Sequence, residues 1–111
     1  MILIKKVSDV EYDVEVTETK LVPARISRSL YLALESFKNK SEFIRTAINK
    51  VIENNIDLTT IRIDENRNKI ITFRIEYSIY MKMIEHAQRY QSMNEFVNRA
   101  IWWGIENDIL N

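Results

Sequence analysis

The side chains that carry most covalent and metal chemistry in proteins are almost missing from this sequence. Its 111 residues include no cysteine, one histidine (His86) and one glycine (Gly104). The lack of cysteine excludes thiolate ligands and thiol nucleophiles, and one histidine provides neither a zinc cluster nor the base of a serine relay. A single glycine does not make a phosphate-cradling loop. We therefore predict a binding protein without catalytic residues, metal, cofactor or small-molecule site, in which His86 is an ordinary, partly exposed helical residue.

Charged side chains are the remaining candidates for binding chemistry. Sixteen basic residues balance sixteen acidic ones, so the formal net charge is zero. This balance argues against a polycation that coats nucleic acid by charge alone. The charges are nevertheless uneven: residues 1–19 hold two basic and five acidic side chains, residues 20–54 seven and three, and residues 69–107 five and four. The sequence therefore predicts an acidic leading segment followed by a basic module.

The distribution of apolar residues predicts a soluble, cytoplasmic protein. Uncharged runs such as Ala100–Ile105 reach only about six residues, far fewer than a membrane span needs. Met1–Ile4 is too short for a signal peptide, and its basic residues follow the apolar run instead of preceding it.

The elements that position the charges come from an internal repeat. The first parts of the two copies align with a shift of 49 residues, and the last parts with a shift of 53. The aligned segments are Lys20–Ile26 with Lys69–Ile75, Ser29–Leu34 with Ser78–Met83, and Glu42–Ile48 with Glu95–Ile101. The second copy thus carries four extra residues, about one helical turn, which lengthens a helix without rotating its apolar face.

Each copy reads as a strand followed by two helices. Strict alternation predicts the strands, with Val22, Ala24 and Ile26 on one face of the first and Ile71, Phe73 and Ile75 on one face of the second. We expect the first helices to start near Ser29 and Ser78, and the second helices after Ser41 and Asn94, which are good capping residues. A unit of this size cannot bury its own apolar faces, so two units must pair. They could pair within one chain, because residues 55–68 are long enough to bring the second strand back, or each could pair with a unit of another chain.

A further strand is expected ahead of each unit. Asp9–Val16 alternates acidic with apolar residues, and Ile61 and Ile63 align with Tyr12 and Val14. Such strands would cover the edges of a ribbon or extend a sheet between chains. The predicted organisation is an α+β fold with an acidic strand segment at 1–19, a first unit at 20–54, a linker or possible strand at 55–68, and a second unit at 69–111.

A strand, a helix and a helix at this spacing resemble the ribbon-helix-helix superfamily, the fold of the Arc and methionine repressors. Ser41–Ile48 follows that family's Ser-Glu-hydrophobic-Ile-Arg-x-Ala-hydrophobic pattern, and Ile70–Ile75 looks like a family ribbon strand. Asn94–Ile101 departs from the pattern at Asn98, where the family has arginine. The resemblance covers about two-thirds of the chain. The tandem arrangement is similar to relaxosome accessory proteins of conjugation and to some archaeal viral regulators.

The resemblance implies that the two strands pair antiparallel and enter the major groove of double-stranded DNA, as in a transcription regulator or repressor. Arg25 and Arg74 would each offer a fork to guanine, worth about 1–3 kcal/mol, and Thr72 would suit an adenine or thymine edge. Leu21 and Ile70 would contact thymine methyl groups, or else cover an apolar neighbour. The implied base-reading residues are Leu21, Pro23, Arg25, Ile70, Thr72 and Arg74.

Pro23 occupies the central reading position of the first copy and has no N–H to donate to a strand ladder. One interpretation is that the first copy reads DNA poorly, so that contacts are asymmetric and favour a non-palindromic site. The other is that the proline stands where the N–H would point outward and unpaired.

The resemblance also implies that the second helices clamp phosphates with free backbone N–H groups and the helix dipole. Cationic side chains near the ribbon or helix ends would neutralise further phosphates, or would simply be solvated. They are Lys20, Arg28, Lys38, Lys40 and Lys69. The implied phosphate-binding residues are Lys20, Arg28, Ser41, Glu42, Phe43, Lys69, Asn94, Glu95 and Phe96.

Trp102 and Trp103 align with the polar residues Asn49 and Lys50, so they fall off the apolar stripe. Two neighbouring tryptophans there predict an interface, unless other parts of the chain cover them. A homo-oligomer is expected, because several short sites along DNA raise affinity through effective concentration.

Two other functions remain open. A relaxosome or partition accessory protein would use the same DNA contacts, whereas an antitoxin-like or assembly module would bind protein. The chain stops at Asn111, just past the last predicted helix, which weighs against the toxin-wrapping tail of an antitoxin.

Overall fold

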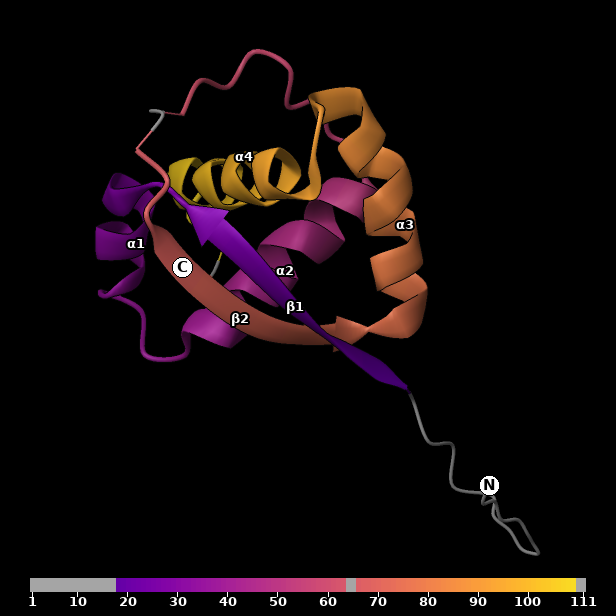
Figure 1. Cartoon of the computed structure of the whole chain (residues 1–111), viewed down its shortest axis with the longest axis horizontal. Helices are drawn as coiled ribbons and strands as arrows, with labels where there is room; N and C mark the ends of the chain where they lie inside the picture. Colours follow the sequence, from indigo (N-terminus) through magenta and orange to yellow (C-terminus); the bar gives the residue numbers. More distant parts are fainter. Residues whose placement is uncertain (1–17, 64–65, 110–111) are drawn as a thin grey trace, which may run out of the picture.

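The structure is a computed structural model that describes residues 18–63 and 66–109, and it has an α+β fold (Figure 1). Within these residues the two strands form a two-stranded antiparallel sheet, and four α-helices and one short 3-10 helix complete the fold. The order strand, helix, helix occurs twice. The elements are β1 (Thr19–Ile26), α1 (Arg28–Leu34), α2 (Lys40–Glu53), β2 (Lys69–Glu76), α3 (Tyr77–Ala87), the 3-10 helix η1 (Gln88–Tyr90) and α4 (Met93–Glu106).

β1, from the first copy of the repeat, pairs with β2, from the second copy, in a register that is symmetric between the copies. Lys20 pairs with Ile75, and its counterpart Lys69 pairs with Ile26, which is the counterpart of Ile75. Pro23 pairs directly with its own counterpart, Thr72. The two strands of one chain therefore form a ribbon whose register is symmetric about this central pair.

The alternation predicted from the sequence is present in both strands. Val22, Ala24 and Ile26 in β1 and Phe73 and Ile75 in β2 are buried. Ile71, which was expected on the same face, is half-buried. In Figure 1 the ribbon crosses in front of α2 and α4, with α1 at one end and α3 at the other. The helices thus cover one face of the ribbon and leave the opposite face open.

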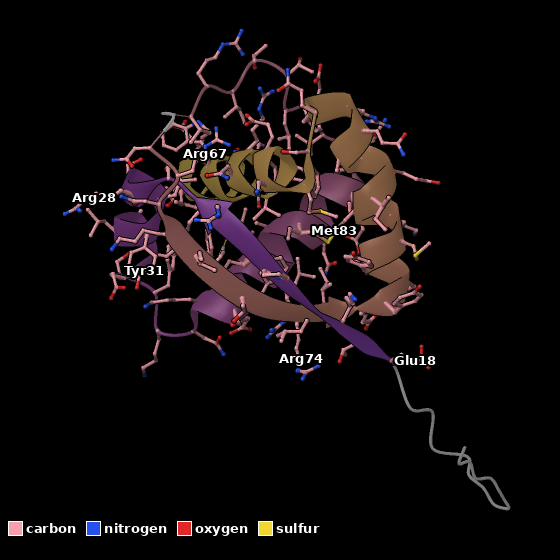
Figure 2. All side chains as sticks on the ribbon, viewed as in Figure 1. Glu18, Arg28, Tyr31, Arg67, Arg74 and Met83 are labelled. Atoms are coloured by element: carbon pink, nitrogen blue, oxygen red, sulfur yellow. The ribbon has the colours of Figure 1, made fainter. Side chains whose placement is uncertain are left out.

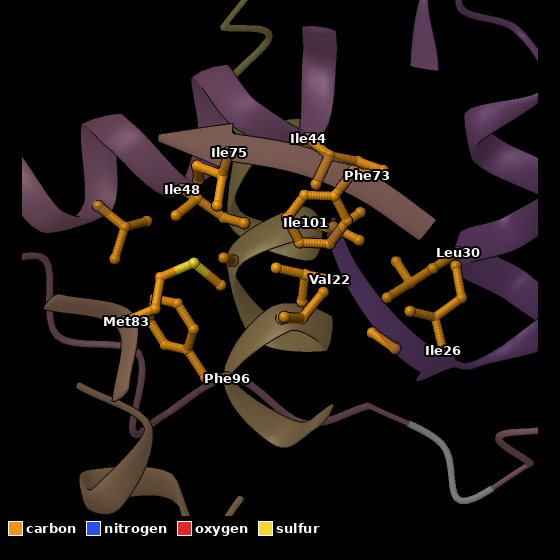
Figure 3. Packing of buried hydrophobic residues seen from close by; sticks show 14 of the residues in the cluster. Val22, Ile26, Leu30, Ile44, Ile48, Phe73, Ile75, Met83, Phe96 and Ile101 are labelled. Carbon is orange, nitrogen blue, oxygen red and sulfur yellow. The ribbon is translucent and has the colours of Figure 1, made fainter. Parts of the chain in front are cut away.

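The core lies between the covered face of the ribbon and the two long helices (Figure 3). Phe43 from α2 and Phe96 from α4 are among its largest fully buried side chains. Gly104 stands where α4 passes close to α2, because a Cβ atom added there would lie 3.0 Å from the Cβ of Ala47 and 3.1 Å from the Phe43 ring. The one glycine of the chain is therefore explained by close helix packing.

The second copy's four extra residues lie in its first helix, as predicted. Helix α1 has 7 residues and α3 has 11. The insertion leaves Met83 and Ala87 buried on the face that packs against the core. A full turn lengthens the helix while its apolar stripe keeps its direction.

The predicted helix starts were wrong by one or two residues. Ser27, Asn39 and Ser92 cap α1, α2 and α4, so three helices begin earlier than the prediction from Ser29, Ser41 and Asn94. Asn39 and Ser92 each accept a hydrogen bond from the N–H of a glutamate three residues on, a common capping arrangement. Helix α3 starts directly after Glu76, which makes no side-chain capping bond. Each of the three caps lies two residues before another good capping residue, which explains the error.

The strand expected at Ile61 and Ile63 is not formed. Both residues belong to an irregular connection, and their side chains pack half-buried against the core. Leu58, in the same connection, is fully buried. The apolar side chains that suggested a strand are thus used for packing without a strand partner. The other expected leading strand, Asp9–Val16, lies outside the described residues.

No helix among the described residues is long and apolar enough to cross a membrane.

Candidate nucleic-acid interface

The open side of the ribbon, called the outward face below, consists of three cross-strand pairs. Its six residues are the predicted base-reading set, and all six are exposed. The pairs are Leu21 with Arg74, Pro23 with Thr72, and Arg25 with Ile70. The symmetric register therefore places one arginine beside one aliphatic side chain on each side of the central pair.

The two aliphatic side chains of the outward face are unusually open. Leu21 is 49% exposed and Ile70 is 59% exposed. Covering a leucine or isoleucine side chain stabilises a complex by roughly 1.5–3 kcal/mol. Within the described residues no apolar neighbour fully covers either side chain, so both remain available to a partner.

Neither arginine of the outward face forms an ion pair with a carboxylate within the described residues. The Arg74 side chain donates a hydrogen bond of 3.3 Å to the hydroxyl of Thr19. Figure 2 shows Arg74 projecting from β2 toward the end of the ribbon near Glu18, away from Arg28 and Tyr31 on α1. Two guanidinium forks thus face outward on a strip of otherwise neutral side chains.

Pro23 does not break the strand ladder. The N–H of Arg25 donates to the side-chain oxygen of Asn94, at 3.0 Å, so it points away from β2. Along an antiparallel strand, N–H groups two residues apart point to the same side. The N–H that Pro23 lacks would also have pointed away from β2. This favours the interpretation of a proline at an unpaired position, while the central pair still has different chemistry on its two strands.

Helices α2 and α4 hold the outer edges of the ribbon. Asn98, which is fully buried, accepts from the N–H of Ser27 at 2.9 Å and donates to the carbonyl of Arg25 at 2.9 Å. At the opposite edge its counterpart, Arg45, donates to the carbonyl of Arg74 at 3.4 Å. Asn98, where the ribbon-helix-helix pattern has arginine, therefore still contacts the ribbon edge, although its side chain is shorter.

Fewer of the predicted phosphate-binding residues than expected have a free backbone N–H group at the starts of the second helices. The N–H groups of Phe43 and Phe96 bond to the carbonyls of their capping residues, and those of Glu42 and Glu95 bond to the capping side chains. Because the helices start two residues earlier, the N–H groups without an acceptor in the described chain belong to the first two residues of each helix. Of the predicted residues, only Ser41 and Asn94 keep a free N–H.

Both the backbone N–H and the carboxylate of Glu95 form hydrogen bonds within the protein. Burial alone would raise its pKa, but hydrogen bonds from Arg67 and Arg99, each at 2.7 Å, outweigh this effect and hold the pKa below its usual range. Arg99 also donates to the carbonyl of Leu58 at 3.1 Å. The sequence reasoning missed this cluster, which ties the 55–68 connection to α4. The i,i+4 spacing of Glu95 and Arg99 was the available signal.

Hollows of about 240 Å³ each lie where a helix start meets the ribbon. One is lined by Tyr31, Lys40, Ser41 and Thr72, among others. The other is lined by Pro23, Ala24, Arg25, Ile70 and Asn94. Free N–H groups of α2 and α4 therefore stand beside the outward face, one helix at each strand.

The predicted lysines contact aromatic rings from the opposite copy. The amino group of Lys20 lies 5.5 Å from the ring centre of Tyr80, and that of Lys69 lies 5.3 Å from Tyr31. Lys40, another of the predicted lysines, lies 5.8 Å from the centre of the Tyr31 ring and forms an ion pair with Glu35 at 2.9 Å. Arg28 is exposed at the start of α1. The cationic side chains thus gather near the ribbon ends.

A larger hollow, of about 520 Å³, lies between α2 and the end of β2. Three carboxylates, from Glu42, Glu53 and Glu76, line it together with Arg45 and Arg74. Its mixed charge does not favour a phosphate, so the hollow is not included in the candidate interface.

The predicted interface tryptophans are half-buried. Trp102 and Trp103 both pack against the core. Large apolar side chains are more exposed on α3, where Tyr77, Met81 and Ile84 recur at spacings of four and three residues. The helical spacing of these three residues was visible in the sequence and indicates an apolar stripe on one face of the helix. The homo-oligomer stays a prediction.

His86 was expected to be partly exposed, and this was wrong. It is 8% exposed, its ring centre lies 6.0 Å from that of Phe96, and its Nδ1 has no partner within the described residues. Burial, and then the charge of Arg89, lower the pKa of His86. Within the described residues no group of three or more His, Asp or Glu side chains is arranged to hold a metal ion.

Comparison of the chain with protein-family models, with curated proteins and with solved structures finds no match.

Proposed function

We propose that this protein binds double-stranded DNA specifically, as a ribbon-helix-helix transcription regulator that inserts the β1–β2 ribbon into the major groove. One observation carries the proposal. The uncovered face of a two-stranded ribbon presents two open aliphatic side chains and two arginines that form no ion pair within the described residues, arranged symmetrically about a central pair. The major groove is wide enough for such a ribbon, and its base edges display the groups that these side chains recognise.

The chemistry of the outward face suits base edges. A guanidinium fork matches the O6 and N7 acceptors of guanine, and an exposed aliphatic group matches a thymine methyl. Arg25 and Arg74 would supply the forks, and Leu21 and Ile70 the apolar contacts. Thr72 adds a hydroxyl and a methyl group between them.

The helix starts support the proposal as positioning contacts. Phosphate contacts set the orientation of a protein on the duplex, while base contacts provide specificity. The free N–H groups at the starts of α2 and α4 lie beside the ribbon, and Lys20, Lys40 and Lys69 lie at its ends. In this proposal they bind the backbone on either side of the groove.

The same contacts would serve a relaxosome or partition accessory protein. The two roles differ in where the site lies, so footprinting on the DNA around the protein's own gene distinguishes them: a footprint over a promoter supports transcription control, and one at a transfer or partition locus supports the alternative. A protein-interaction module is the candidate of a different class, and the exposed stripe on α3 is the observation that favours it.

Selection from a random pool of duplexes tests the proposal directly. The purified chain should enrich one sequence class, and a mobility shift on that duplex should resist competition by a scrambled one. A chain that enriches no sequence, or that binds both duplexes equally, contradicts specific DNA binding.

A further inference from the structure

The outward face is symmetric in its outer pairs but not at its centre. Leu21 with Arg74 on one side matches Ile70 with Arg25 on the other. The central pair places the hydroxyl of Thr72 opposite the ring of Pro23, and both side chains are exposed. At the point where the two copies meet, only β2 can therefore exchange a hydrogen bond with a base.

The helix starts differ in the same way. Lys40 begins α2, whereas the aligned residue at the start of α4 is Met93. The amino groups of Lys40 and Lys69 both lie within 6 Å of the Tyr31 ring centre, at 5.8 Å and 5.3 Å. Lys69 beside Tyr31 has its counterpart in Lys20 beside Tyr80, so the two ends differ by Lys40, whose ammonium also forms an exposed ion pair with Glu35 at 2.9 Å.

The side chain of Asn94 at the start of α4 is occupied in a different way. The side-chain oxygen of Asn94 accepts a hydrogen bond from the backbone N–H of Arg25, and the backbone carbonyl of Asn94 accepts one from the Asn98 side chain at 2.7 Å. It therefore holds the ribbon edge, and no lysine lines the hollow beside it. The α4 end of the interface is fixed to β1, and the cationic side chain that lines its hollow is Arg25 of the outward face.

Both differences fall in the same half of the interface. The hollow beside α2 brings Thr72 together with Lys40 and Ser41, whereas the hollow beside α4 brings Pro23 together with Asn94. A ribbon with identical halves would bind a duplex equally well in its two orientations. Here the half containing Thr72 and Lys40 offers a base contact that the other half lacks, together with an ammonium group whose ion pair with Glu35 is exposed at both partners and can therefore be exchanged for a phosphate.

We infer that this chain binds a DNA site that is asymmetric at its centre, and that it does so in a single orientation set by Thr72 and Lys40. The inference rests on the proposed DNA-binding function. Its outer contacts read both half-sites alike, and the preference for one orientation comes from one hydroxyl and one ammonium group. A difference of one hydrogen bond to a base corresponds to roughly a tenfold preference, and the additional phosphate contact increases it.

Because the sequence has no cysteine, one introduced thiol can carry a DNA-cleaving iron chelate at a unique position. Ser36 lies between α1 and α2, and Gln88 lies between α3 and α4, and both are exposed. Ser36→Cys and Gln88→Cys are therefore matched reporters of the two ends. On the duplex selected by the wild-type chain, we expect each reporter to cut one flank only, and the two reporters to cut opposite flanks.

Cleavage of both flanks to a similar extent by each reporter, on a duplex that still shows a mobility shift, overturns the single orientation. The absence of any shift on the selected duplex instead overturns the proposed function itself. The two failures are thus separated by the binding gel that accompanies each cleavage reaction.

A second pair of variants tests the assignment to Thr72 and Lys40. Combining Thr72→Val with Lys40→Met keeps the side-chain shapes, at two exposed positions, but removes the hydroxyl and the ammonium. Each reporter in this background should cut the two flanks to within about twofold of each other. Retention of one-flank cleavage, with circular dichroism unchanged, overturns the assignment. Arg62→Ala, at an exposed position in the 55–68 connection, is the control and should leave the cleavage pattern as in wild type.

Discussion

Replacing both Arg25 and Arg74 with alanine removes the two guanidinium groups from the outward face of the ribbon. Both residues are exposed, and the Arg74 side chain makes one long hydrogen bond, of 3.3 Å, to Thr19. Surface substitutions of this kind usually change the free energy of unfolding by no more than about 0.5 kcal/mol. The thermal unfolding of the double variant should therefore overlay that of wild type.

The effect on DNA affinity should be much larger. A bidentate contact between arginine and guanine contributes about 1–3 kcal/mol. The two arginines lie on opposite sides of the central pair, so their losses should add. Together they amount to about 2–6 kcal/mol, which corresponds to a rise in Kd of about 30- to 25,000-fold on the selected duplex. Binding to a scrambled duplex depends on phosphate contacts and should change far less.

Fluorescence anisotropy at one salt concentration, with the selected and the scrambled duplex, measures both effects. The matched control combines Arg62→Ala with Lys82→Ala, which removes the same charge from two exposed positions off the ribbon. If the double arginine variant loses no more specific affinity than this control, the outward face does not read bases and the reasoning is refuted.

Three further predictions concern the fold that supports the ribbon. Asn98→Ala leaves the buried N–H of Ser27 unpaired and should lower the free energy of unfolding by about 2–4 kcal/mol in a urea titration. Gly104→Ala places a Cβ 3.0 Å from that of Ala47, so overpacking of about 1–3 kcal/mol should exceed the gain of about 1 kcal/mol in helix propensity and lower the Tm. Burial lowers the pKa of His86, so the unfolded chain gains a proton at a higher pH than the folded chain does. Stability should therefore fall as pH drops below 6.5. His86→Leu should reduce this loss in thermal melts recorded from pH 8 to 5.

For each of these three predictions, one result would contradict the reasoning. An Asn98 variant as stable as wild type would mean that the edge bonds of β1 are made equally well by water. A raised Tm for Gly104→Ala would mean that α2 and α4 can move apart at no cost. An unchanged acid sensitivity in His86→Leu would assign the pH dependence to carboxylates such as Glu95, whose lowered pKa also makes stability fall in acid.

The repeat and its alternation predicted much of the fold. Residues two apart on a strand share a face, so the buried set of β1 was readable from the sequence as Val22, Ala24 and Ile26. The extra turn of α3 was also readable, because four added residues preserve a helical stripe. Helix starts were less predictable. Ser27 and Ser29 are equally good capping residues by type, and the choice depends on which hydroxyl reaches a free N–H group.

The sequence by itself determined the two strand–helix–helix patterns and which side chains of each strand would face outward, because these follow from local periodicity. Only the tertiary structure decided what those side chains meet. Pairing across the chain set Pro23 opposite Thr72, and packing committed Asn98 to the ribbon edge and Glu95 to two arginines. These contacts join residues from about 30 to 70 positions apart as well as helical neighbours. Their geometry depends on how the two halves fit together in space, which no local pattern encodes.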